Sequence, residues 1–210
     1  MIDKRYFVVI RYMIADVDVG LLAGRCIKVL HGFLSSENNQ IHNGIGVAFP
    51  KWTRLSLGNE IAFVSTERRG LEQLTEQPYF KMMVSDKIFA VSSIYNVPEG
   101  IPEVRFIRNQ NIAKCFTGEK RRRLDRCRRR AIARGETFEP KNDFNQRDIG
   151  LFHRIYMSSK STNNRYLLHI QKEQTDLVRY DFNSYGFATN KQYQGSVPDF
   201  SHATYFSPLK

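Results

Sequence analysis

The most restrictive feature of this sequence is a basic run from Glu119 to Arg134, which no hydrophobic core can enclose. The run sets one Lys and eight Arg against two acidic residues, a balance of +7 out of a formal net charge of +11. Charge this dense repels itself unless a polyanion lies against it, and a phosphate backbone is the commonest such partner. The run therefore predicts nucleic-acid binding.

The same run predicts a single helix at about residues 117–135. It contains neither Gly nor Pro, and Gly135 follows it where helices often end in a left-handed cap. Leu124, Cys127 and Ala131 recur at helical spacing and form a thin apolar stripe. We expect the helix to be held along this stripe, with its Arg side chains offered to a ligand. A solvated surface helix or a localisation signal is the alternative interpretation of such a run.

Length and composition indicate one or two small domains with a real core, because the chain has 210 residues, of which 41% are hydrophobic. No apolar run approaches the length of a membrane span. The apolar segment near the N-terminus is too short for a signal peptide. We therefore expect a cytoplasmic protein that does not bind membranes.

Cysteine and histidine usage gives no indication of a metal site. The three cysteines form no Cys-x-x-Cys pair, and their odd number argues against a disulfide framework. The five histidines are scattered and lack the usual ligand spacings. We expect metal-independent chemistry and no small-molecule cofactor.

The first half of the chain predicts the β-α-β-β-α-β order of a ferredoxin-like domain, within an α+β fold. Asp18 is expected to cap a helix from Val19 to Ser35, and a second helix follows Thr66 and should bend or end at Pro78. The expected strands are rich in β-branched and aromatic residues and cover 5–11, 45–49, 60–65 and 88–97.

The character of the sequence changes at Pro98, where Gly and Pro mark a linker. We expect a ferredoxin-like domain at 1–98 and a smaller, irregular α+β domain at 99–210. The second domain is expected to be built around the Arg-rich helix. Its expected strands cover 104–107, 151–157, 166–171 and 178–182, with a polar loop at 158–165.

His31 is a candidate for chemistry because it lies next to the apolar face of the first expected helix. We expect its side chain to be half exposed at the edge of that face. A neutral imidazole beside a phosphodiester can take the proton from a ribose 2′-hydroxyl. The alternative is a boundary histidine without a catalytic role.

Five segments, which follow one another over nearly the whole chain, carry a family resemblance. They are VLHGF, IGVAFP, the Arg-rich run into ARGETFEP, SSKST followed by RYLLHI, and FNSYGFATN. Together they resemble the CRISPR repeat-processing endoribonuclease of type I-F systems. VLHGF and RGETFEP are most similar to the version in transposon-associated systems, and an ordinary system is the alternative.

The resemblance implies a metal-independent enzyme that binds the stem-loop of CRISPR repeat RNA and cuts at the 3′ base of the stem. It implies that the protein then stays on the 3′ hairpin of the mature CRISPR RNA. Its implied partners are the other subunits of the surveillance complex, Cascade, above all the backbone subunit next to that hairpin.

The resemblance also implies which residues form the active site. His31 occupies the place of the family's catalytic histidine, and Tyr185 in FNSYG fits the tyrosine that arranges the site. Ser159 matches the catalytic serine two positions ahead of a Ser-Thr pair, with Ser158 as the alternative. Tyr166 corresponds to the aromatic residue that stacks on the base pair at the foot of the stem.

Base reading at the foot of the stem is implied for Arg108 and Gln110, which can bridge guanine and adenine respectively. Relatives carry two adjacent arginines after the leucine of the basic helix, whereas here Cys127 follows Arg126, and Arg130 is the alternative second arginine. The RNA-binding residues expected on the helix are Arg122, Arg123, Arg126, Arg129 and Arg130.

Two other classes of function compete with the endoribonuclease. One is a hairpin-binding subunit of a ribonucleoprotein that does not cleave, in which His31 is a boundary residue. The other is a structural RNA-binding protein, for which a ferredoxin-like half and positive charge suffice. The combination of His31, Ser159 and Tyr185 favours the enzyme, because a structural protein has no need of that set.

Overall fold

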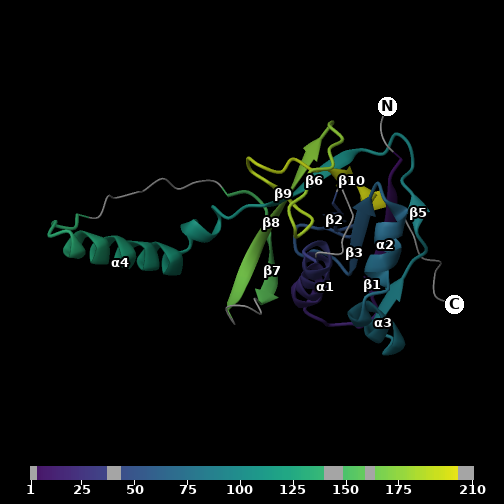
Figure 1. Cartoon of the computed structure of the whole chain (residues 1–210), viewed down its shortest axis with the longest axis horizontal. Helices are drawn as coiled ribbons and strands as arrows, with labels where there is room; N and C mark the ends of the chain where they lie inside the picture. The colour runs from purple at the N-terminus through teal and green to yellow at the C-terminus, as the bar shows by residue number, and fades with distance from the viewer. Residues whose placement is uncertain (1–3, 37–43, 140–148, 159–163, 203–210) are drawn as a thin grey trace.

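The computed structural model describes residues 4–36, 44–139, 149–158 and 164–202, arranged as two five-stranded sheets with α1 between them (Figure 1). The fold is α+β, as predicted. Among the described residues, no helix is both long and apolar enough to cross a membrane.

The first sheet has the strand order β2-β3-β1-β4, and every pairing in it is antiparallel. This is the ferredoxin-like arrangement that the order of elements predicted. The strands are β1 (Tyr6–Tyr12), β2 (Gly46–Ala48), β3 (Glu60–Ser65) and β4 (Phe89–Val91), and β5 (Tyr95–Asn96) also pairs with β1.

The strand expected at 88–97 is interrupted. Both of its parts, β4 and β5, pair with β1, but the Ser92 side chain lies between them and its Oγ accepts a hydrogen bond from Val9 N at 3.0 Å. A side chain therefore takes the place of a backbone carbonyl in the ladder, which explains the break.

The helices of the first half begin where the sequence predicted. In α1 (Val19–Leu34), the Asp18 carboxylate accepts a hydrogen bond from Leu21 N at 3.0 Å and caps the first turn. The second helical pattern divides at Pro78, as expected, because proline fits the first turn of a helix but not its interior. It forms α2 (Arg68–Thr75) and α3 (Pro78–Ser85).

The second sheet has the order β10-β6-β8-β7, and β9 pairs with β6 in parallel. Its strands are β6 (Glu103–Arg108), β7 (His153–Ser158), β8 (Arg165–Thr175), β9 (Ala188–Thr189) and β10 (Val197–Pro198). The short 3₁₀ turns η1 (Ala113–Cys115) and η2 (Phe200–His202) complete the described elements.

The prediction of a strand at 178–182 is wrong, because the segment forms no regular strand. That segment runs beside 194–196, with hydrogen bonds from Ser196 N to Arg179 O and from Gly195 N to Asp181 O. The Arg179 amide, however, donates to the Ser196 side chain at 3.1 Å rather than to a backbone carbonyl. A regular ladder is therefore not completed.

The Arg-rich helix α4 (Thr117–Ala133) projects away from both sheets (Figure 1). Gly135 follows it with φ +70°, which confirms the left-handed cap. The expected docking along the apolar stripe is wrong, because Leu124 is 41% exposed and only Ala131 in the stripe is buried. The second half is therefore built around β6 and β8, where large side chains are buried, and not around α4.

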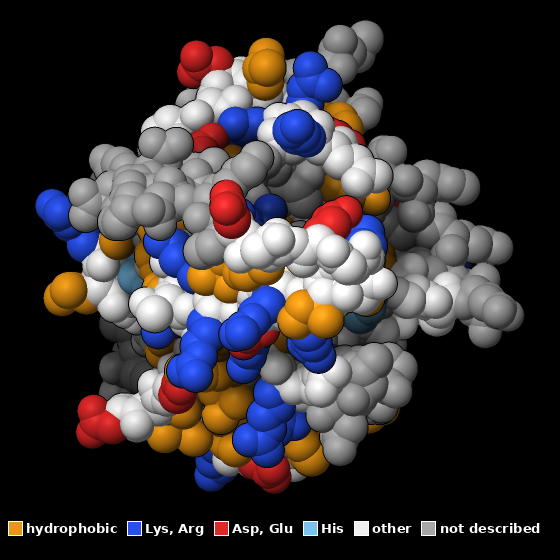
Figure 2. All heavy atoms as spheres, turned by 90° about the vertical axis from the view of Figure 1, so that its left-hand side faces the viewer, with side chains coloured by type: hydrophobic (Ala, Val, Ile, Leu, Met, Phe, Trp, Pro, Cys, Tyr) orange, Lys and Arg blue, Asp and Glu red, His pale blue; other side chains and the backbone are white. Residues whose placement is uncertain are grey.

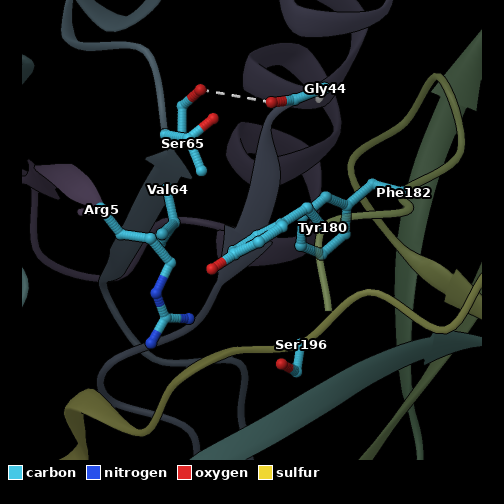
Figure 3. Close-up of a pocket in the computed structure, with 8 residues that line it drawn as sticks. Arg5, Gly44, Val64, Ser65, Tyr180, Phe182 and Ser196 are labelled. Atoms are coloured by element: carbon cyan, nitrogen blue, oxygen red, sulfur yellow. Dashed lines mark hydrogen bonds between the residues drawn. The ribbon is translucent and has the colours of Figure 1, made fainter. Parts of the chain in front are cut away.

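A buried ion pair joins the two halves of the chain. The guanidinium of Arg5, the residue before β1, donates to both carboxylate oxygens of Glu103 at 2.6 and 3.0 Å, and Ser196 Oγ donates to the same carboxylate. Arg5 and Ser196 also line a small cavity with Tyr180 (Figure 3). One hydrophobic cluster crosses residue 98, so the domain boundary there stays a prediction.

Candidate functional site

His31 and Tyr185 form the centre of the candidate site. The two rings stack with their centroids 4.4 Å apart and their planes 13° from parallel. His31 is half buried, at the edge of the apolar face as expected. Its Nδ1 is buried with no hydrogen-bond partner among the described residues, which leaves Nε2 as the ring nitrogen that a substrate can reach.

A tight turn after residue 182 aims Tyr185 at His31. The side-chain oxygen of Asn183 accepts hydrogen bonds from Tyr185 N at 2.8 Å and from Phe187 N at 3.2 Å. Gly186 has φ +79°, and a Cβ there would lie 2.5 Å from the Val47 side chain, so only glycine fits without strain. The FNSYGF segment is therefore built to hold one tyrosine in place.

Tyr166 and Arg108 complete a four-residue cluster around the Tyr185 ring. The Tyr166 and Tyr185 hydroxyls lie 3.1 Å apart, and the Arg108 guanidinium lies 5.0 Å from the Tyr185 ring centroid, at cation–π range. Burial and then the hydrogen bond with Tyr185 raise the pKa of Tyr166 to about 12, against the opposing charge of Arg108. The Tyr166 hydroxyl is therefore protonated at neutral pH.

Two glycines bring α1, and with it His31, close to the second sheet. A Cβ on Gly24 would lie 2.0 Å from Tyr156 O, and one on Gly20 would lie 2.8 Å from Arg154 O. The backbone of α1 therefore packs directly on β7. This close approach allows residues from α1, β6, β8 and the turn after residue 182 to meet in one site.

The predicted serine, Ser159, lies outside the described residues. The alternative, Ser158, ends β7, and its Oγ accepts a hydrogen bond from Lys28 Nζ at 2.9 Å. Sequence reasoning missed Lys28, although it precedes His31 by three positions and so lies on a neighbouring part of the same helix surface. That spacing was the signal that could have found it.

The other predicted RNA-binding residues lie apart from this cluster. Gln110 is exposed in the turn after β6, two positions beyond Arg108. The predicted arginines of α4 are all exposed on the projecting helix. These arginines are Arg122, Arg123, Arg126, Arg129 and Arg130. On the face of the molecule from which α4 projects, Lys and Arg side chains gather near the middle (Figure 2).

A groove of about 670 Å³ runs beside the cluster, between α1 and the β7–β8 pair. Tyr166 and Ser158 line it at the end near the cluster, and Lys28, Arg25 and Leu21 follow along α1. Sequence reasoning did not predict this groove, because its two walls are more than 100 residues apart in the chain.

Within the described part of the chain, no three or more His, Cys, Asp or Glu side chains are grouped so that they could hold a metal ion. The three cysteines are free. The groups available for chemistry in the cluster are an imidazole, two phenols and a guanidinium, which suit proton transfer and the binding of an anion.

Comparison with known proteins gives one strong match and several weak ones. The family model described as "CRISPR-associated protein (Cas_Csy4)" matches residues 10–200. No curated protein matches the sequence. A solved structure titled "CRISPR associated protein Cas6" is 10% identical with a TM-score of 0.37, and covers 93% of this chain and 98% of its own.

A second solved structure, "Csf5, CRISPR-Cas type IV Cas6 crRNA endonuclease", is 9% identical with a TM-score of 0.32, and covers 88% of this chain and 97% of its own. A third, "Putative Chlorite dismutase TA0507", is 11% identical with a TM-score of 0.28 over 84% of this chain and 81% of its own. At such scores, these similarities carry no argument about function.

Proposed function

Because the chain belongs to the Cas_Csy4 family of CRISPR-associated proteins, we propose that it is an endoribonuclease that processes CRISPR repeat RNA. Its substrate is the repeat stem-loop, and the cut falls at the 3′ base of the stem. The observation that carries this proposal is the stacking of His31 on Tyr185, beside Tyr166 and Arg108.

In the proposed reaction, the ribose 2′-oxygen attacks the adjacent phosphorus. His31 Nε2 takes the 2′-hydroxyl proton, the new O2′–P bond forms, and the P–O5′ bond breaks as the departing O5′ gains the proton that His31 gives up. The products are a 2′,3′-cyclic phosphate on the stem and a 5′-hydroxyl on the downstream strand, so neither water nor a metal ion enters the step. Tyr185 and Ser159 position the ribose, and Arg108 offsets charge on the phosphate.

Recognition of the stem is assigned mainly to α4, which lies outside the cluster. The exposed arginines of α4 are suited to phosphates on both strands of a short hairpin. Within the cluster, the Tyr166 ring is available to stack on the last base pair. Arg108, also in the cluster, and the exposed Gln110 are the candidates for reading bases at the foot of the stem.

After the cut, the phosphates that face α4 all belong to the retained hairpin. We therefore expect the protein to stay on its product, as part of a cytoplasmic surveillance complex. Excess substrate should give a burst of about one equivalent of enzyme and little more, because product release limits turnover. Rapid multiple turnover would contradict this part of the proposal.

The experiment that tests the reaction is incubation with a repeat stem-loop in excess chelator, followed by analysis of the product ends. A 2′,3′-cyclic phosphate and a 5′-hydroxyl are expected. Replacing the scissile 2′-hydroxyl with hydrogen should stop the cut, because it removes the nucleophile. A 3′-hydroxyl product, or a complete dependence on added metal, would refute the mechanism.

One observation favours a second candidate, a hairpin-binding subunit that does not cleave. His31 Nδ1 has no described partner that would fix the tautomer and orientation of the ring. If the ring is misoriented in the complex, binding persists and the cut is lost. The same assay separates the candidates, since the second predicts tight binding of intact RNA.

A further inference from the structure

We propose that the groove between α1 and the β7–β8 pair binds the single-stranded RNA that continues on the 3′ side of the cut. This inference rests on the proposed function and adds a binding site to it. The groove and the four-residue cluster share Tyr166, so a strand that leaves the cluster can enter the groove directly.

The charges of the groove match an RNA strand. Arg25 and Lys28 on α1 face Arg165 at the start of β8, and Asp18 is the single acidic residue among the lining residues. No carboxylate in the described residues forms an ion pair with any of these three cations. A phosphate backbone is therefore their complementary partner, and Lys28 is held across the groove by its hydrogen bond to Ser158.

The apolar part of the lining also suits unpaired bases. Tyr156 is 49% exposed, and Leu21 and Leu167 are exposed beside it, although large apolar side chains more often lie inside. Proteins that bind single strands combine a basic track with exposed aromatic rings, because every base offers a π face for stacking. An apolar protein segment would not require the three cations.

The position of the groove selects the 3′ strand. The strand that is cut passes through the cluster and continues beyond the scissile phosphate, whereas the 5′ strand leaves the stem without crossing the cluster. The lining residues of the α1 wall run from Asp18 to Lys28, a length of about 15 Å at 1.5 Å per residue. The groove should therefore hold the substrate strand that is lost after cleavage, and strengthen the binding of substrate relative to product.

The test compares three hairpins with a 2′-deoxy substitution at the cut: the stem-loop alone, with a single-stranded 3′ extension, and with a 5′ extension. For the unaltered protein, the 3′ extension should tighten binding about tenfold, as expected for one or two stacked bases, and steepen the salt dependence. The 5′ extension should leave the affinity within about twofold.

The groove variant is Arg25→Gln with Tyr156→Ala, both exposed positions. It should bind the stem-loop alone normally and lose the tenfold gain from the 3′ extension. The matched control is Arg69→Gln with Tyr95→Ala, an exposed pair that does not line the groove, and it should keep the gain.

The proposal is overturned if the 3′ extension gives no gain, if the groove variant keeps the gain, or if the 5′ extension gives the same gain. Each of these results leaves the proposed function intact, provided that the protein binds the stem-loop and cuts the all-ribose version. Failure to bind the stem-loop alone would instead refute the proposed function.

Discussion

His31 is the residue whose removal should separate binding from chemistry. We predict that His31→Ala lowers the single-turnover cleavage rate by about a hundredfold or more, because general-base catalysis contributes roughly 10² to 10⁴. Hairpin affinity should stay within a few fold, since the base acts in the transition state. Quench-flow and filter-binding assays measure the two effects. The control is His153→Ala, which removes a histidine outside the cluster and should cleave normally.

Tyr166 should keep its proton well above neutral pH. Burial, and then the hydrogen bond with Tyr185, raise its pKa from 10.0 to about 12. The protonated form is thus favoured by folding, so its contribution to stability is complete below pH 10 and is lost as the pH rises through about 12. A tyrosine-selective NMR titration, assigned with Tyr166→Phe, should show a midpoint above the ordinary value. A midpoint at 10 or lower would contradict the burial argument.

At the scale of elements, α1 is positioned by its glycines. Alanine normally stabilises a helix by about 0.5–1 kcal/mol relative to glycine. At Gly24, however, the new Cβ would overlap Tyr156 O at 2.0 Å, whereas at Gly32 nothing lies within 4 Å. We predict that Gly24→Ala destabilises the fold and slows cleavage by moving His31, while Gly32→Ala raises the free energy of unfolding. Urea denaturation measures the free energy of unfolding of both variants, and a single-turnover assay measures cleavage. Equal changes in the two variants would show that α1 does not need the close approach.

For α4, the prediction concerns RNA affinity and its salt dependence. Replacing Arg122, Arg126 and Arg129 together with Gln should lower the slope of log affinity against log salt by about 2–3, at roughly 0.9 per lost phosphate contact. Cleavage of saturated RNA in a single turnover should persist. The control removes the same charge from the exposed residues Arg69, Lys81 and Lys87, and should leave the slope unchanged. An unchanged slope in the α4 variant would mean that this helix faces solvent or another protein.

At the scale of the whole molecule, the ion pair between Arg5 and Glu103 ties the two sheets together. Both residues are less than 10% exposed, so Glu103→Ala would leave a buried guanidinium without its partner. We predict a loss of about 3–5 kcal/mol in the free energy of unfolding, and a smaller loss when both residues become Leu. The control is Glu72→Ala, which breaks the exposed pair with Arg68 and should cost less than about 1 kcal/mol. Similar losses in the two alanine variants would refute the role of burial.

Local chemistry allowed the sequence to predict where several helices begin and end. Asp18 caps the start of α1, Pro78 begins α3, and Gly135 forms the left-handed cap that follows α4. Each of these signals acts on backbone groups a few residues away. The periodicity of apolar residues then predicted the ferredoxin-like order of strands. The segments around His31 and Tyr185 resemble a known family, and this resemblance indicated which residues to consider for the site.

Errors arose where distant residues decide the outcome. The strand expected at 88–97 is broken by a hydrogen bond from Val9 N to the Ser92 side chain. In the segment 178–182, the Arg179 amide donates to the Ser196 side chain, so a complete backbone ladder does not form. The predicted docking of α4 along its apolar stripe was also wrong, since a thin stripe of small residues could not show whether a surface existed to receive it.

The sequence by itself thus determined that this chain has an Arg-rich helix, a ferredoxin-like half and a histidine beside an apolar face. Only the tertiary structure decided that His31 stacks on Tyr185, that Lys28 reaches Ser158, and that a groove opens next to them. The physical reason is separation along the chain: capping and periodicity act over a few residues. The site depends instead on α1 lying against β7, which the missing side chain of Gly24 permits.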